Sequence, residues 1–569
     1  MSETITGRVR GLASRVPDEL AIAGVRADSD VTWTWSQLWK RSEQVAALLR
    51  QLEVRPGEVV AYQLPNRVEF VAITLGVLLA GGVCCPLMPI YREHELLFML
   101  SRARARVLFA LDELRGRHHA AEIAALEPQL GALEHVVVLG DEPERIPAAR
   151  AGAAGRVRWS AWSAMGADSD AQPERTRPAS EQADIPQPAN AQRGAADEAG
   201  AGEGVTTSDA LAQLLFTSGT SGLPKGVLHR QDVLTEAAAM QAAHLGLGAQ
   251  DRIYVPSPLA HQTGFLYGMW LALSLGVAQI VQETWDPVRG LAALREWGGT
   301  FVQAAPTFLA DLTSAVENGA LAPVSLRLFV ATGAAVPHAI AERGGRALGA
   351  GICGAFGTTE GCLATLGSLA DPAEKAQRSD GRPLHGVGIR VRDEQGNLLA
   401  AGREGHLETR SPTMFAGYLE DPAATVRTFT SDGWYRTGDL AMIDADGYLH
   451  VTGRVKDVIN RGGEKIPVAH IEQLLYQHAA VKEVAIVAMP DERLGERACA
   501  FIVPQGAASF DLGVLQAFLD QQRVARQYWP ERVELVDALP RTASGKVRKY
   551  QLRERAGNLG AGRSPGAMA

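Results

Sequence analysis

Cysteine is scarce in this sequence, and its spacing excludes two classes of protein. The five cysteines among 569 residues are Cys84, Cys85, Cys353, Cys362 and Cys499. An odd number cannot close into a disulfide framework, and none of the spacings matches a zinc-binding motif. The pattern excludes a small secreted protein held by disulfides, and it predicts a reducing compartment, the cytoplasm.

An excess of positive charge is also absent. Lys and Arg number 56 against 64 Asp and Glu, which gives a net charge of −8 and an isoelectric point near 6.0. General affinity for nucleic acid needs a basic surface, so no nucleic-acid partner is expected. A local basic groove for phosphate groups is compatible with this balance.

The sequence also lacks an unbroken apolar run that could cross a membrane. Residues 70–91 carry no charge, but Gly81-Gly82, Pro86 and Pro89 divide them into a helix, a turn and a strand-like segment. Residues 253–282 are likewise uncharged and are interrupted by prolines. The first twenty or so residues have no apolar core of a signal peptide, and the C-terminus has no lipidation motif. No transmembrane segment is expected.

Helical and strand-like patterns alternate over the first 400 residues or so, which predicts an α/β fold with parallel sheets covered by helices. One apolar helical face contains Leu38, Val45, Leu49 and Leu52, and residues 59–64 follow as a strand. Asp286-Pro287 predicts a helix start, with Val288, Leu291 and Leu294 on the buried stripe. Residues 301–303 and 326–331 are expected to be buried strands.

Two shifts in composition suggest how the chain is divided. Residues 166–209 are rich in Ala, Gly, Pro and acidic residues and poor in large apolar ones, which predicts a flexible surface insertion. From Gly405 onward, short strands and tight turns predict a β-rich subdomain. A compact αβ segment follows. The boundary is predicted at residues 455–457, which gives an N-terminal domain of 1–455 and a C-terminal domain of 456–569.

The strongest local signal is a strand that runs into a loop of hydroxyls and glycines, Leu214-Leu-Phe-Thr-Ser-Gly-Thr-Ser-Gly-Leu-Pro-Lys-Gly226. Glycines let backbone N–H groups approach phosphate oxygens, hydroxyls add donors, and Lys225 supplies a positive charge. The spacing is not that of a Walker A loop. A flexible Ser/Gly loop that binds nothing is the alternative from composition alone.

Three further motifs follow along the chain. They are Gly354-Ala-Phe-Gly-Thr-Thr-Glu-Gly361, then Tyr435-Arg-Thr-Gly-Asp439 with Gly453-Arg-Val-Lys-Asp457, and finally Pro540-Arg-Thr-Ala-Ser-Gly-Lys546. Together with the 217–226 loop, and in this order, they resemble the signature motifs of the adenylate-forming superfamily, in its acyl-CoA synthetase branch. The resemblance covers nearly the whole chain outside the insertion. It implies a large adenylating domain and a small mobile α+β C-terminal domain.

The residue types in these motifs suit ATP chemistry. Phe356 offers an aromatic face for adenine, although the family more often has Tyr there. Thr359 can donate to a phosphate, Glu360 is an oxygen ligand suited to Mg²⁺, and Asp439 can accept from ribose hydroxyls. A helix cap for Thr359-Glu360 and a turn for Asp439 are the structural alternatives. The predicted ATP-binding residues are Thr217, Ser218, Gly219, Thr220, Ser221, Gly222, Lys225, Ala355, Phe356, Gly357, Thr358, Thr359, Asp439 and Arg454.

The resemblance assigns further roles. It makes Lys546 the catalytic lysine between the substrate carboxylate and the α-phosphate, and Lys456 the hinge of the small domain. It implies that Arg461, Gly462 and Gly463 form the coenzyme A passage, although Gly462-Gly463 could equally be a tight turn. His261 is placed beside the acyl site as a fourth catalytic candidate with Lys546, Lys225 and Glu360. The predicted acyl pocket comprises His261, Phe265, Thr332, Gly333, Ala334 and Gly354, although several of these could be core residues.

The predicted function is therefore ATP-dependent activation of a carboxylic acid to acyl-AMP, with transfer to coenzyme A. A short- or medium-chain, alicyclic or aromatic acid is expected. Loading of a carrier-protein phosphopantetheine is the alternative, and a non-catalytic nucleotide sensor is a third hypothesis. Against the sensor stand Lys225, Glu360, Asp439 and Lys546, since a sensor has no need of a catalytic lysine. The oligomeric state is not predicted.

Overall fold

A computed structural model describes residues 3–27, 29–140, 157–162, 207–217, 224–334, 336–461, 464–491, 494–506, 510–522, 524, 526–542 and 545–561. Of the predicted insertion at 166–209, only 207–209 lie within the described residues. No helix in the described part of the chain is long and apolar enough to cross a membrane.

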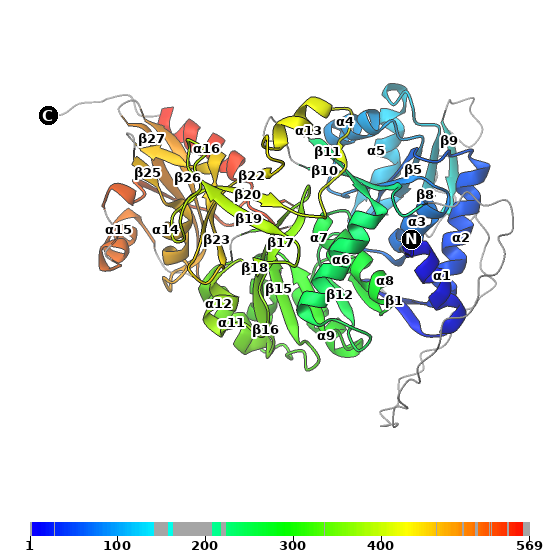
Figure 1. Ribbon diagram of the computed structural model, residues 1–569, viewed down its shortest axis with the longest axis horizontal. Coiled ribbons are helices and arrows are strands. Elements are labelled where there is room, and N and C mark those ends of the chain that lie inside the picture. The colour runs from blue at the N-terminus through cyan, green and yellow to red at the C-terminus, as the bar shows by residue number, and fades with distance from the viewer. Residues whose placement is uncertain are drawn as a thin grey trace.

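Two large, mainly parallel sheets form the N-terminal part of the molecule, as the alternating pattern predicts (Figure 1). The first has nine strands in the order β18-β17-β16-β15-β14-β12-β13-β1-β2. In the same order their bounds are Arg382–Pro383, Cys362–Leu366, Gly351–Thr358, Leu328–Thr332, Phe301–Ala304, Ile253–Val255, Gln279–Gln282, Leu20–Val25 and Val31–Thr34. The pairs from β1 to β16 are parallel, and antiparallel strands close both edges.

The second large sheet has eight strands in the order β21-β11-β10-β4-β3-β5-β8-β9. Their bounds are Gly417–Tyr418, Lys225–Arg230, Leu211–Thr217, Val83–Leu87, Val59–Gln63, Val107–Leu111, His135–Leu139 and Arg158–Ala161. A two-stranded ribbon joins β6 (Glu113–Leu114) to β7 (Arg117–His118). The uncharged stretch at 70–91 folds as predicted into a helix, α3 (Val68–Leu79), a turn and strand β4.

Helices pack on these sheets because each has an apolar face to bury. Those of the N-terminal part are α1 (Ile5–Arg15), α2 (Trp35–Gln51), α3, α4 (Glu93–Ala103), α5 (His119–Leu126), α6 (Gln231–Leu245), α7 (Gln262–Gly264), α8 (Leu271–Leu275), α9 (Pro287–Glu296), α10 (Pro306–Glu317), α11 (His338–Leu348), α12 (Ala373–Arg378) and α13 (Pro422–Thr428). Short η segments are η1 (Glu127–Gln129), the π-helical η4 (Phe265–Trp270), η5 (Val455–Asp457) and η6 (Arg526–Tyr528).

The predicted start of α9 is confirmed, but its predicted buried stripe is partly wrong. The Asp286 side chain accepts a hydrogen bond from Arg289 N at 2.7 Å. Leu291 and Leu294 are buried, whereas Val288 is 58% exposed. Three residues advance a helix by about 300°, so each such step falls about 60° short of a full turn. Two steps therefore move Val288 off the face that carries Leu294.

Two smaller sheets follow. The predicted β-rich subdomain is an antiparallel sheet of β19 (Gly388–Arg392), β20 (Gly405–Arg410), β22 (Tyr435–Ile443) and β23 (Leu449–Arg454), with the 444–447 turn between β22 and β23. It begins before the predicted start at Gly405, because β19 is its first strand. The last sheet contains β24 (Ile459–Arg461), β25 (Glu464–Ile466), β26 (Val481–Asp491), β27 (Gly495–Pro504) and β28 (Arg532–Leu535). Helices α14 (Val468–Leu475), α15 (Leu512–Gln521) and α16 (Lys549–Ala561) pack with it, at the left of Figure 1.

Candidate active site

A cleft of about 2540 Å³ lies where both large sheets, the β19–β23 subdomain and the C-terminal sheet meet. Several parallel strands end at it, and the carboxyl ends of parallel strands are where α/β folds bind ligands. Fifteen of the predicted site residues line it: Thr217, Lys225, His261, Thr332, Gly333, Ala334, Ala355, Phe356, Gly357, Thr358, Thr359, Glu360, Asp439, Arg454 and Lys546. Motifs separated by more than 300 residues therefore converge on one cavity.

Lys225 and Glu360 are connected by an aromatic residue that the sequence did not reveal. The Lys225 ammonium lies 4.6 Å from the ring centroid of Tyr418, and the Tyr418 hydroxyl donates to Glu360 Oε1 at 2.8 Å. Tyr418 is held by pairing of β21 with β11 and by edge-on packing against Phe415 at 4.9 Å. Burial, followed by the nearby Glu360 carboxylate, raises the pKa of Tyr418, so the phenol remains a donor. One side chain thus positions both a cation and a carboxylate.

The turn that carries Thr359 and Glu360 is fixed by a second unforeseen residue. His229 is completely buried, and its Nε2 lies 2.7 Å from the carbonyl oxygen of Thr359. Burial lowers the pKa of His229 to about 4, so the ring is neutral and Nε2 carries the proton that is donated. Thr358 Oγ1 accepts from Gly361 N at 3.0 Å within the same turn. The alternative of a helix cap is wrong, because the segment is the turn between β16 and β17.

Asp439 lies inside strand β22 and not in a turn. It is 2% exposed, and its Oδ1 pairs with Arg454 Nε at 2.9 Å across the β22–β23 ladder. Its Oδ2 is buried without a hydrogen-bond partner. Burial raises the pKa of Asp439, while Arg454 and Lys546 act in the opposite direction. A buried carboxylate oxygen that lacks a donor fits a ligand with hydroxyl donors, such as a ribose.

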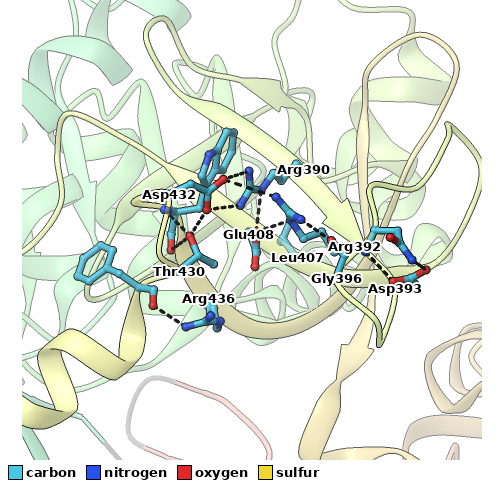
Figure 2. A network of polar contacts seen from close by, with 12 residues as sticks. Arg390, Arg392, Asp393, Gly396, Leu407, Glu408, Thr430, Asp432 and Arg436 are labelled. Carbon is cyan, nitrogen blue, oxygen red and sulfur yellow. Dashed lines mark hydrogen bonds and ion pairs between the residues drawn. The ribbon is translucent and has the colours of Figure 1, made fainter.

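An ionic network braces the sheet that holds Asp439 (Figure 2). Arg390 Nε lies 2.6 Å from Glu408 Oε2, and its terminal nitrogens contact Asp432 at 2.6 and 2.9 Å. Arg392 adds a second contact to Glu408 at 3.2 Å. Glu408 is buried and lies opposite Arg436 in the β20–β22 ladder. Arg436 is three residues before Asp439 on β22. The network connects β19, β20 and the approach to β22 beside the cleft.

Lys546 enters the cleft on a tight loop of the C-terminal domain. Thr542 N donates to Lys546 O at 2.7 Å, and Arg541 contacts both Gly545 O and Glu483. Gly545 has φ +84°, and a Cβ there would lie 2.4 Å from Thr307 Oγ1 of the large domain. Only glycine satisfies both that conformation and that close approach. Gln473 adds a tie between the domains by donating to Val336 O at 3.0 Å.

The charge of Lys546 acts on two groups from different motifs. It helps to lower the pKa of His261, after burial, to about 4, and it opposes the rise in the pKa of Asp439. His261 Nδ1 accepts from Thr263 N at 3.3 Å. The charge of Lys546 is therefore felt by both the predicted acyl-site histidine and the predicted ribose-binding aspartate.

Two predicted pocket residues have other positions. Phe265 is fully buried in the core, with Phe70 and Trp270 against its ring, and it is not among the residues that line the cleft. Thr263 of α7 and Tyr267 of the π-helical turn line the cleft instead. Gly354 lies behind the cleft wall, where a Cβ would meet Ser379 O at 2.2 Å. Its role is close packing, and the neighbouring Ala355 forms the wall.

The other predicted residues are either outside the described part of the chain or not among the residues that line the cleft. Ser218, Gly219, Thr220, Ser221 and Gly222, and also Gly462 and Gly463, are outside the described residues. The two ends of the 217–226 loop lie within the described residues, where Thr217 on β10 pairs with Lys225 on β11. Lys456 lies in η5, between the β19–β23 sheet and the C-terminal sheet. Arg461 contacts Glu531 at 2.6 Å and does not line the cleft.

The fold and the cleft define a class of two-part nucleotide-binding enzymes that form adenylates. Family models for the AMP-binding enzyme and for its C-terminal domain match residues 10–419 and 470–546. The chain belongs to the AMP-binding enzyme family, in the acyl-CoA synthetase branch of the adenylate-forming superfamily, and is an AMP-forming acid–thiol ligase.

Several relatives cover almost the whole chain. The medium-chain fatty-acid–CoA ligase of Escherichia coli is 32% identical over 95% of this chain and 88% of its own length. A salicylyl-CoA synthase/salicylate adenylyltransferase from a Streptomyces species is 33% identical over 93% of this chain and 90% of its own. The crystal structure of ATP-bound MatB from Rhodopseudomonas palustris superposes with a TM-score of 0.78 at 26% identity, over 98% of this chain and 100% of that one.

Proposed function

We propose that the protein joins a carboxylic acid to AMP at the expense of ATP, releases pyrophosphate, and then transfers the acyl group to coenzyme A. One observation carries this proposal: Lys225, Asp439 with Arg454, and Lys546 lie around a single cleft although they come from both ends of the chain. The arrangement provides cations for phosphates and a carboxylate for a ribose.

The first half-reaction follows from charge. The substrate carboxylate and the α-phosphate are both anionic, and each must approach the other for the carboxylate oxygen to attack phosphorus. Lys546 between them lowers that repulsion, and Lys225 holds the phosphates that leave as pyrophosphate. The products are a mixed anhydride, acyl-AMP, and pyrophosphate. His261, neutral near pH 7, adds no third charge beside the acid.

Glu360 is the proposed protein ligand for Mg²⁺. Mg²⁺ is commonly held by one or two carboxylates together with substrate phosphates. In the part of the chain that the structure describes, no group of three metal-ligating side chains occurs. The carboxylate of Glu360, held through Oε1 by the Tyr418 hydroxyl, fits a site shared with substrate phosphates. The ion would neutralise charge on the departing pyrophosphate.

The second half-reaction needs a different arrangement of the small domain. The coenzyme A thiol attacks the acyl carbonyl, and AMP leaves with the electron pair of the broken C–O bond. The charge of Lys546 acts on His261 in this structure, so we propose that the domain turns about Lys456 between the two steps, which withdraws the lysine and admits the thiol. The domain division at 455/456 and a role for Arg461, Gly462 and Gly463 in holding coenzyme A belong to this proposal.

The acid itself is proposed by class. His261, Thr332, Gly333 and Ala334 offer a narrow, mostly small-residue wall, and Tyr267 adds an aromatic one. The two curated relatives act, by their names, on medium-chain fatty acids and on salicylate. We propose a medium-chain, alicyclic or aromatic monocarboxylic acid.

Acid-dependent exchange of labelled pyrophosphate into ATP tests the first step across a panel of such acids. AMP release is then compared with coenzyme A and with a phosphopantetheinyl carrier protein as acceptor. Thioester formation with coenzyme A supports the proposal. Transfer to the carrier alone would favour a carrier-loading ligase, and absence of exchange with every acid would favour a nucleotide sensor.

A further inference from the structure

Asp380 occupies the junction between the strand that carries Phe356 and the hairpin that carries Asp439. The Asp380 backbone N–H donates to Leu449 O on β23 at 2.8 Å, and its carbonyl accepts from Thr365 Oγ1 at 2.5 Å. Thr365 pairs directly with Phe356 in the β16–β17 ladder. Two elements of the cleft that lie far apart in sequence therefore fix the backbone of Asp380.

Asp380 is among the residues that line the cleft. Its Oδ2 accepts from Val451 N at 2.8 Å. Burial raises the pKa of Asp380 to about 6, the Val451 hydrogen bond and His450 oppose the rise, and Asp439 adds to it. Within the described residues no lysine or arginine forms an ion pair with this carboxylate. A partly buried carboxylate without a cation costs stability, and such groups gather at functional sites.

Its position relative to the ribose-binding pair suggests what it meets. Val451 lies three residues before Arg454 on β23, which is about 10 Å along a strand. Phe356 and Val451 both pack against the apolar cluster that includes Ala441 and Leu449. A nucleoside with its sugar at Asp439 and Arg454 and its base against Phe356 therefore extends along β23 toward Asp380.

We propose that Asp380 accepts a hydrogen bond from the exocyclic amine of adenine and so makes the cleft selective for 6-aminopurine nucleotides. The inference rests on the proposed function only in placing the nucleotide in this cleft. A 6-oxopurine, as in inosine or guanosine nucleotides, would present a carbonyl oxygen to the carboxylate. The carboxylate and the 6-carbonyl are both hydrogen-bond acceptors, so they repel each other and both lack a donor. Binding of the 6-oxopurine nucleotide is therefore weakened relative to that of the 6-aminopurine nucleotide.

The test compares ATP with ITP, which differ at the 6-position of the base by an amine against a carbonyl. In acid-dependent pyrophosphate exchange, wild-type protein should favour ATP by roughly 100-fold in kcat/KM, as expected when a buried acceptor is left unpaired. In Asp380→Asn the amide can turn its NH₂ toward the 6-carbonyl. We expect the ATP/ITP ratio to fall below about tenfold, chiefly through faster use of ITP.

Asp371→Asn is the matched control. Asp371 also lies beside the β22–β23 hairpin, accepts from the Tyr448 hydroxyl at 2.8 Å and does not line the cleft, so this variant should keep the wild-type ratio. Because a ratio measured on one preparation is insensitive to the folded fraction, partial unfolding does not mimic the effect. The serine hydroxyl in Asp380→Ser can both donate and accept, so this variant should also have a lower ATP/ITP ratio of kcat/KM than the wild-type protein.

Calorimetric binding of AMP and IMP gives a second readout that needs no turnover. If no nucleotide supports exchange, the proposed function fails, and the AMP/IMP affinity ratio in wild type and Asp380→Asn still decides the inference. Wild-type protein that handles ATP and ITP equally overturns it. So does an unchanged ratio in both Asp380 variants.

Discussion

The ammonium of Lys546 in the C-terminal domain lies close enough to His261 in the N-terminal domain to help lower the pKa of that imidazole. We propose that this arrangement is the one that serves the first half-reaction, with the lysine at the acid's side of the cleft. Gly545 is in contact distance of Thr307, so the loop seats against α10.

Replacement of Lys546 by alanine should separate the two half-reactions. We expect acid-dependent pyrophosphate exchange to fall by roughly 100- to 1000-fold, the range found when a charge-stabilising group is removed. Thioester formation from supplied acyl-AMP should fall by less than about fivefold, because the proposed rotation withdraws the lysine in that step. Equal losses in both assays would contradict rotation of the small domain.

Tyr418 offers a way to separate a hydrogen bond from a ring. Tyr418→Phe keeps the aromatic face beneath Lys225 and removes the donor to Glu360, whose loss should slow adenylation roughly tenfold. Tyr418→Leu removes both and should cost more. The measurement is kcat/KM for ATP at saturating acid and magnesium. If the Phe variant matches wild type, the hydroxyl has no part in positioning Glu360.

His229 predicts how stability depends on pH. Its pKa in the folded protein is about 4 against a usual 6.5. Between those two pH values the imidazole is protonated in the unfolded chain but neutral in the folded protein. The free energy of unfolding therefore decreases as the pH falls from about 6.5 to about 4. For a shift of this size the contribution reaches at most about 3 kcal/mol.

The comparison is between wild type and His229→Gln, which keeps an N–H donor for Thr359 O and cannot titrate. Urea unfolding at pH 7.5 and 5.0 should show a smaller loss of stability in the variant than in wild type. Other buried histidines act equally in both proteins. If wild type and His229→Gln lose the same free energy of unfolding between pH 7.5 and 5.0, His229 is not held neutral in the folded protein.

The Arg390 network in Figure 2 makes a prediction about stability alone. Arg390→Ala removes the main partner of buried Glu408 and should cost about 2–4 kcal/mol, because a buried carboxylate is left undercompensated. Arg343→Ala, which breaks an exposed pair with Glu317, should cost under about 1 kcal/mol. Adding Glu408→Gln to Arg390→Ala should recover part of the loss. Equal effects of both arginine variants would show that the network has no special role.

Site residues that belong to short local motifs could be predicted from the sequence, whereas residues that act through distant partners could not. Phe356, Glu360, Asp439 and Lys546 stand in short strings, and each lines the cleft. Tyr418 and His229 were missed because their roles come from pairing with residues 58 and 130 positions away in the chain. No local pattern distinguishes such a tyrosine or histidine from one that packs in the core.

Phe265 and Val288, whose predicted positions differ from those in the structure, show a second limit of sequence-based prediction. Phe265 was assigned to the pocket because it follows His261 closely, but the π-helical turn directs it into the core. Val288 was assigned to the core by three-residue spacing, but helix geometry carries it to the surface. The class of the large sheets was more predictable, since an alternation of buried strands and helices is typical of parallel sheets covered by helices.

The nucleotide product tests the central claim most directly. Purified protein is incubated with Mg-ATP, coenzyme A and each acid of the panel, and the products are separated by ion-exchange chromatography. With a substrate acid, AMP and pyrophosphate should form in equal amounts and in step with thioester. Formation of ADP and orthophosphate instead would contradict attack of the acid on the α-phosphate.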